Sequence, residues 1–284
     1  MDATVAAVVL DGEGKIVSCR IDVAQNKMDI TDGLVDTEKT FRTKMELGPE
    51  YNMKPASPIG AEWDEQTKAF EEYVVGMTGA EVAAMETTEH NGHQISVDEA
   101  LLAGCTMDIT AFITAVEKAC SDEWAVEFTA ADGFTLGVAA ISEAGDSTAA
   151  TAEEDGVVKM YSEFAAVVLD GEGKIIAALN DATQPKITIG TAGEIVEAAF
   201  KGTKRELGPE YNMKPASPIG VEWDEQSAAF SKFVVGMTGA EVAAMETTEH
   251  NGHQVSVDET LYASCTMQIT GMMAVVALAA DYAR

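Results

Sequence analysis

A tandem duplication is the feature that most limits how this chain can fold. Residues 46–60, ELGPEYNMKPASPIG, recur letter for letter at 206–220, and the stretch from Val74 to Gln94 recurs unchanged from Val234. The period is about 160 residues, which is too long for a solenoid unit, so each copy is expected to have its own core. We therefore predict two domains, residues 1–122 and residues 123–284.

The two copies differ at their beginnings. The run AAVVLDGEGKI occurs at Ala6 and again at Ala165, but only the second occurrence is preceded by a long segment, residues 124–159, that has no counterpart in the first copy. We expect the first repeat to lack its N-terminal strands, as it would if Met1 lay inside a longer precursor whose leader had been removed.

Each copy reads as strands followed by helices. Two β-rich runs flank Asp11-Gly-Glu-Gly14, which is typical of a hairpin turn. Ser57-Pro58 predicts a helix start, and Trp63, Phe70 and Val74 then fall on one helical face. Strands grouped before helices indicate the α+β class, with a small antiparallel sheet and helices packed on it in each repeat.

Further helices are expected in the second half of each copy. Thr78-Gly-Ala-Glu81 has the spacing of a capping box before a short helix. A closing helix is predicted to begin near Thr106, with Phe112 and Val116 on its apolar face.

The composition excludes several classes of partner. Apolar residues make up 46% of the 284 residues, enough to fill a core, and no apolar run is long enough to span a bilayer. Lys and Arg total 18 against 48 Asp and Glu, a formal charge of −30. Such a chain repels nucleic acid and anionic membrane surfaces.

The segment TTEHNGHQISVDEALLAGCT, residues 87–106, contains His90, His93 and Cys105, whose side chains are zinc ligands in other proteins. Asn91-Gly92 is a strong turn former, however, so the alternative is an exposed polar turn, which we favour. The sequence therefore predicts no metal site here.

The four cysteines leave two questions open. Cys105 precedes a predicted helix, where a thiol pKa can be lowered, but its apolar neighbours favour a buried and inert thiol. Cys19 and Cys120 face Ala178 and Ala280 of the second copy. In one alternative they form a disulfide within the first repeat, which implies an oxidising compartment. In the other they are two small buried residues that happen to be cysteine.

The run from Asp98 through Gly104-Cys105-Thr106 to Phe112 resembles a degenerate form of the flavin-attachment segment of FMN-binding domains, which occur in redox-pump subunits and bacterial surface flavoproteins. The hairpin Asp-Gly-x-Gly-Lys-Ile and the run Val-Val-Gly-Met-Thr ending at Thr78 fit the same resemblance. It implies an FMN-binding-domain-like fold, with FMN held through its phosphate at a threonine. A small-residue turn before a helix suits a phosphate. The implied cofactor-binding residues are Gly104, Cys105 and Thr106 in the first repeat and Ser264, Cys265 and Thr266 in the second.

The segment from Leu47 to Gln66 also resembles a group of exported tandem-repeat proteins of Gram-positive bacteria, which implies an extracytoplasmic location, secreted or lipid-anchored at the cell surface. Its Tyr51, Lys54, Trp63 and Glu65 could line a ligand groove. In the alternative that we favour, Trp63 is a core residue while Lys54 and Glu65 are solvated.

No nucleophile triad, close carboxylate pair or phosphate-binding glycine loop stands out, so turnover chemistry is not expected. Two functions remain at this point. The first is an extracytoplasmic flavin-binding or electron-transfer protein with degenerate FMN sites, with a small-molecule ligand or redox partner. The second is a non-catalytic ligand-binding or structural surface repeat protein without flavin.

Overall fold

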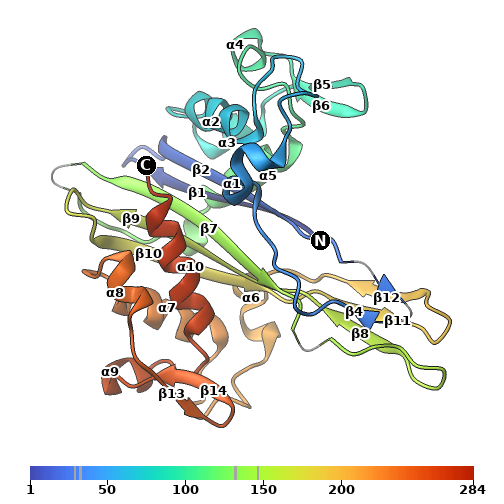
Figure 1. Cartoon of the computed structure of the whole chain (residues 1–284). Helices are drawn as coiled ribbons and strands as arrows, with labels where there is room; N and C mark the ends of the chain where they lie inside the picture. Colours follow the sequence, from blue (N-terminus) through green and yellow to red (C-terminus); the bar gives the residue numbers. More distant parts are fainter. Residues whose placement is uncertain (29, 32–33, 131–132, 146) are drawn as a thin grey trace.

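The computed structural model describes residues 1–28, 30–31, 34–130, 133–145 and 147–284, and it has the expected α+β class (Figure 1). Two antiparallel sheets lie face to face in the middle, and each carries its own helices on its outer side. The order of layers is therefore helices, sheet, sheet, helices, with one repeat supplying the first two layers and the other repeat the last two.

The same series of elements occurs in both repeats, and the second repeat has additional strands. The first repeat contains β1 (Asp2–Leu10), β2 (Ile16–Gln25), β3 (Ile30–Thr31), β4 (Leu34–Val35), α1 (Lys44–Leu47), η1 (Gly48–Tyr51), α2 (Trp63–Tyr73), α3 (Gly79–Ala83), β5 (Thr87–His90), β6 (His93–Ser96), α4 (Glu99–Leu102), α5 (Thr110–Ala119) and η2 (Asp122–Trp124). The second contains β7 (Thr135–Glu143), β8 (Gly156–Lys159), β9 (Tyr161–Leu169), β10 (Ile175–Thr183), β11 (Lys186–Ile189), β12 (Ile195–Ala199), α6 (Lys204–Leu207), η3 (Gly208–Tyr211), α7 (Trp223–Phe233), α8 (Gly239–Ala243), β13 (Thr247–His250), β14 (His253–Ser256), α9 (Glu259–Tyr262) and α10 (Thr270–Asp281).

The main sheets differ by one strand. In the second repeat, β9 pairs with β10 on one side and with β7 on the other. Its counterpart in the first repeat, β1, pairs with β2 alone among the described residues. The first sheet therefore has the hairpin predicted around Asp11-Gly-Glu-Gly14 but no strand at the position of β7. Asp11 closes that turn by accepting from the backbone N–H groups of Glu13 and Lys15.

The apolar run AAVVL is buried on both faces of its strand, which explains its lack of polar alternation. In β9, Ala165 and Val167 face the helices of the second repeat, whereas Val168 faces the other sheet. In β1, Ala7 and Val9 pack against Leu136 of β7 and its neighbours between the two sheets. Burial between the sheets joins the two repeats through apolar contacts.

The helix-facing cores confirm the predicted apolar faces. Trp63, Phe70 and Val74 of the first repeat are at most 3% exposed, and Phe70 and Phe112 meet edge to face. Trp63 is thus a core residue, as favoured above, while Lys54 and Glu65 are exposed. The capping box at Thr78 and Glu81 is also confirmed.

Two predicted helix starts are wrong. The helix expected at Ser57-Pro58 begins at Trp63, because Glu62 and Glu65 form a capping box there and Ser57 lies in a preceding turn, its hydroxyl accepting from Ala61. The closing helix expected near Thr106 begins at Thr110. Within the described ranges, none of the helices has both the length and the hydropathy needed to cross a bilayer.

Candidate functional site

The two threonines singled out by sequence are held by buried glutamines. The side-chain carbonyl of Gln66, in α2, accepts from the backbone N–H of Thr106 at 2.9 Å and from its hydroxyl at 3.1 Å. The amide nitrogen of the same glutamine donates to Ser57 Oγ and to the carbonyl of Ala61, both at 3.1 Å. In the second repeat, Gln226 makes the same contacts with Thr266.

The neighbouring residues of this segment are also engaged. A Cβ at Gly104 would lie 2.8 Å from Cβ of Ala69, so the glycine allows the end of α4 to approach α2 closely. Ser264, its counterpart, donates its hydroxyl to carbonyls of α9. Cys105 and Cys265 are buried, and burial raises the pKa of each thiol to about 11. The burial of these thiols, favoured from the sequence, is thus confirmed, and their low reactivity stays a prediction.

A phosphate at the start of α5 would meet a carboxylate. Asp108 accepts from the backbone N–H groups of Gln94 and Thr110. The N–H group of Thr110 at this helix start, and the N–H and hydroxyl of Thr106, are therefore already used. As arranged here, the six residues implied by the resemblance do not fit a phosphate group, and Gln268 stands at the position of Asp108 in the second repeat.

The histidines lie on hairpin turns. His90 and His93 pair across β5 and β6, are exposed, and enclose Asn91-Gly92 with positive φ angles of 53° and 84°. This is the polar turn that we favoured over a metal site. In the part of the chain that the structure describes, no group of three His, Cys, Asp or Glu side chains is placed to hold a metal ion.

Cys19 and Cys120 are free thiols in the structure. Cys19 is buried, and Cys120 lies half-buried against the same core. The structure thus favours the alternative of two small core residues over the disulfide, and the argument for an oxidising compartment loses this support.

A buried lysine in the second repeat makes a site that the sequence did not predict. Lys204, the first residue of α6, is 6% exposed, and its Nζ donates to Tyr161 Oη at 3.3 Å. The same Nζ lies 4.6, 4.8 and 5.2 Å from the ring centroids of Tyr161, Tyr211 and Trp223. Tyr161 in turn donates to Glu163 Oε1 at 3.4 Å.

Lys204, Tyr161, Glu163, Tyr211 and Trp223 together form what we call the lysine cluster. Burial shifts the pKa values of its two charged groups. Desolvation lowers the pKa of Lys204 to about 8, although Glu163 and Asp181 act against the shift. Desolvation also raises the pKa of Glu163 to about 7, opposed by Lys204. Two groups with pKa values near neutral, about 7 for Glu163 and about 8 for Lys204, therefore lie in one buried cluster.

A cavity of about 310 Å³ opens beside the lysine cluster. Its lining carries three cationic side chains and a single carboxylate, on a chain of formal charge −30. The lining also offers apolar and aromatic surface, including Phe200, which is 63% exposed. The charged and aromatic lining residues are Lys186, Lys201, Lys204, Glu197, Phe200 and Tyr211.

Sequence reasoning missed this site because half of it is absent from the first repeat. Lys44 lies over the rings of Tyr51 and Trp63, as Lys204 does over Tyr211 and Trp223. Tyr161 and Glu163, however, are replaced by Asp2 and Thr4 in the aligned first copy. The sequence feature that points to this site is the lysine that the two copies share, Lys44 and Lys204. The sequence prediction used Lys54 instead.

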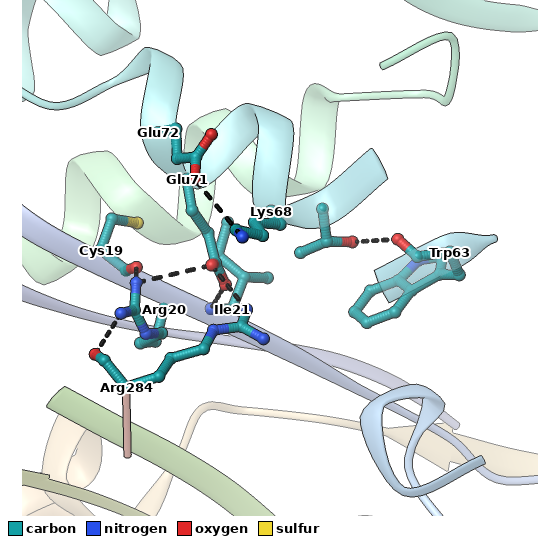
Figure 2. Close-up of polar contacts among 9 residues, drawn as sticks. Cys19, Arg20, Ile21, Trp63, Lys68, Glu71, Glu72 and Arg284 are labelled. Atoms are coloured by element: carbon teal, nitrogen blue, oxygen red, sulfur yellow. Dashed lines mark hydrogen bonds and ion pairs between the residues drawn. The ribbon is translucent and has the colours of Figure 1, made fainter. Parts of the chain in front are cut away.

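A second charged cluster joins the repeats. Figure 2 shows the carboxylate of Glu71, from α2, between Arg20 of β2 and Arg284 at the chain end. Glu71 Oε2 lies 2.8 Å from Arg284 and 3.6 Å from Arg20, and Oε1 accepts from the backbone of Ile21 at 2.8 Å. Arg20 also donates to the carbonyl of Arg284. Both carboxylate oxygens of Glu71 have partners within the protein, whereas the Nε of Arg20 is buried without a hydrogen-bond partner. The cluster is an inter-repeat contact.

Comparison with known proteins gives one partial similarity. The chain is 36% identical over 96 aligned residues to a protein named chlorophenol reductase from Desulfitobacterium hafniense, and the match covers 29% of this chain and 29% of that protein. No family model and no solved structure matches the chain.

Proposed function

We propose that the protein is an extracytoplasmic binding protein for an aromatic anion of the flavin mononucleotide class, with a role in electron transfer, and that the cavity beside Lys204 receives the ligand. The observation that carries the proposal is the concentration of cationic and aromatic side chains around one cavity of a strongly acidic protein. A surface of that charge repels anions in general, so a local cationic lining is needed to hold one.

The lining offers partners for both the anionic group and the aromatic ring of such a ligand. Lys186 and Lys201 line the cavity and are exposed, and within the part of the chain described none of the three lysines forms an ion pair. They offer a phosphate or phenolate unpaired positive charge. Phe200 and Tyr211 offer ring surface for stacking. A volume of about 310 Å³ is at the lower end of the range for small-molecule sites.

The similarity to chlorophenol reductase supports the same ligand class. A chlorophenolate is an aromatic anion, and a reductase transfers electrons. The chain spans less than a third of the length of that relative. The relative's activity is therefore assigned to this chain only as a part of the proposal.

A second candidate function is a non-catalytic surface repeat protein without flavin. It is favoured by the hydrogen bonds of Thr106 and Thr266 to Gln66 and Gln226, which use the groups that the resemblance assigns to the cofactor. In this case the segments around Thr106 and Thr266 serve only to hold α2 and α7 in place.

FMN titration of the purified chain separates the two functions. We expect saturable quenching of FMN fluorescence at one site, at least about tenfold weaker binding to Lys204→Met, and unchanged binding to Lys214→Met, because Lys214 is exposed and does not line the cavity. A chlorophenol should compete. Absence of saturable binding, or equal binding of FMN and riboflavin, would contradict the proposal. Fractionation of producing cells tests the extracytoplasmic location.

A further inference from the structure

Three polar groups of the lysine cluster form one hydrogen-bonded chain. Nζ of Lys204 donates to Tyr161 Oη at 3.3 Å, and this hydroxyl donates to Glu163 Oε1 at 3.4 Å. Tyr161 and Glu163 lie two residues apart on β9, so their side chains leave the same face of the strand. A proton can therefore pass between the carboxyl, the hydroxyl and the amine without entering solvent.

The fold does not need the carboxyl at the end of this chain. Glu163 is 6% exposed, and a Cβ on Gly271, in the first turn of α10, would overlap with its Oε2. The aligned residues of the first repeat are Thr4 and Ala111, so that repeat folds with neither a glutamate nor a glycine there. Burial of a carboxyl costs stability unless partners compensate it. Its presence beside Lys204 therefore points to a chemical role.

Lys204 places a reactive amine in the wall of a cavity. It lines the cavity of about 310 Å³, and 6% of its surface is exposed. Burial lowers its pKa to about 8, so about a tenth of the amine is uncharged at pH 7, against less than about a thousandth for an ordinary lysine. An uncharged amine in a desolvated site adds readily to carbonyl groups. The titratable groups around it are Tyr161, Glu163, Asp181 and Tyr211 and, in the cavity lining, Lys186, Glu197 and Lys201.

We propose that Lys204 forms an imine with an aromatic aldehyde that carries an anionic group. The uncharged amine adds to the aldehyde carbon, and the nitrogen electron pair of the resulting carbinolamine then forms the C=N bond as the hydroxyl leaves. Tyr161 donates the proton that converts this hydroxyl into water, and Glu163 restores that proton to Tyr161. The products are a protonated imine, a Glu163 carboxylate and one water molecule, so no oxidant or reductant is needed.

The choice of aldehyde rests on the proposed function, whereas the covalent step does not. Phe200 and Tyr211 offer the ring a stacking surface, and Lys186 and Lys201 offer the anionic group positive charge. The covalent step depends on Lys204 and the two groups hydrogen-bonded in series to it.

The test treats the purified chain with para-formylbenzoate and cyanoborohydride, which reduces an imine to a stable secondary amine, and locates the adduct by peptide mass spectrometry. We expect one adduct, at Lys204, formed at least about tenfold faster than at Lys44. Lys44 is the matched internal control, because it also begins a helix and lies over a tyrosine and a tryptophan ring but has Asp2 and Thr4 in place of Tyr161 and Glu163. Accessibility alone favours Lys44, which is the more exposed of the two lysines.

The pH profile tests the carboxyl. Imine formation needs an uncharged Lys204 and a protonated Glu163, whose pKa values are about 8 and about 7. The initial rate should therefore pass through a maximum between about pH 7 and pH 8. Glu163→Gln should react at least about fivefold more slowly at pH 7, and its rate should rise to a plateau above about pH 8. The exposed Glu172→Gln should keep the native profile, and the same profile in Glu163→Gln would contradict the role of Glu163.

Four further results separate the outcomes. Equal labelling of Lys204 and Lys44, or no adduct at Lys204 in a chain that binds FMN, would overturn the proposal and leave the proposed function intact. An adduct at Lys204 without saturable FMN binding would support the imine and contradict the proposed function. The neutral para-formylbenzamide should react several-fold more slowly, and an equal rate would contradict the preference for an anion. Because these measurements use the native side chain, they do not depend on the folding of Lys204→Met, which should give no adduct at residue 204.

Discussion

The side-chain amide of Gln66 is fully buried and joins Thr106 to Ser57. The oxygen accepts two hydrogen bonds from the threonine and the nitrogen donates to the serine and to the carbonyl of Ala61. All four hydrogen-bonding positions of the amide are thereby used. One side chain thus connects the turn before α2, α2 itself and the loop before α5.

Replacing this glutamine should destabilise the protein strongly. Gln66→Ala leaves the buried N–H of Thr106 without its partner and opens a cavity, so we expect the free energy of unfolding to fall by about 3 kcal/mol. Chemical denaturation measures the loss. Thr106→Val, which removes only the hydroxyl, should cost about 1 kcal/mol. The exposed Gln25→Ala should change stability by less than about 0.5 kcal/mol, and equal losses for Gln25 and Gln66 would refute the structural role.

The thiols should be unreactive in the folded protein. Burial raises the pKa values of Cys105 and Cys265 to about 11 and also raises that of Cys19. Little thiolate is present at pH 8. A disulfide-exchange reagent should therefore react slowly with native protein, with the half-buried Cys120 reacting first, and should count four thiols after denaturation without reductant. A count of two would mean that Cys19 and Cys120 are bonded.

Glu163 should make stability depend on pH. Its pKa is about 7 in the folded protein against an ordinary 4.5, so the folded state holds the proton more tightly than the unfolded chain does. Its contribution to stability is fully present below pH 4.5 and is lost as pH rises through 7. Glu163→Gln should flatten the decline in urea midpoint between pH 5 and pH 7.5. The exposed Glu172→Gln serves as control, and an unchanged slope in Glu163→Gln would contradict the assignment.

Binding of an anion beside Lys204 should weaken at alkaline pH. The pKa of Lys204 is about 8, so its positive charge is lost as pH rises from 7 to 9, whereas an exposed lysine keeps its charge over this range. FMN affinity should fall several-fold over that interval in the native chain. In Lys204→Met the affinity should be lower at every pH and nearly independent of pH, and a parallel decline in both proteins would indicate another titrating group.

The hairpins and helix faces were predictable because their signals are local. Asp11 and Gly14 specify a turn within five residues, and the spacing of Trp63 and Phe70 specifies one buried face. The start of α2 was misplaced because Ser57-Pro58 carries a start signal that the chain uses in a turn, while Glu62 and Glu65 provide the cap. Two helix-start signals of comparable strength therefore lie close together in this segment. The contacts of Gln66 with Ser57 and Thr106, which fix the turn, cannot be predicted from local sequence patterns.

The lysine cluster could not be found in this way. Lys204 and Tyr161 are 43 residues apart and meet only because β9 and α6 lie at the same end of the second sheet. Comparison of the two copies emphasised identical residues such as Thr106 and Thr266, whereas Tyr161 and Glu163 occur in the second copy alone.

A crystal structure of the chain soaked with FMN tests the proposed function most directly. The account predicts electron density for the isoalloxazine ring against Phe200 or Tyr211, with the phosphate within hydrogen-bonding distance of at least one of the cavity lysines. Gln66 should keep its hydrogen bonds to Thr106. Density for the phosphate at Thr106 or Thr266, or an unchanged cavity beside Lys204 at saturating FMN, would contradict it.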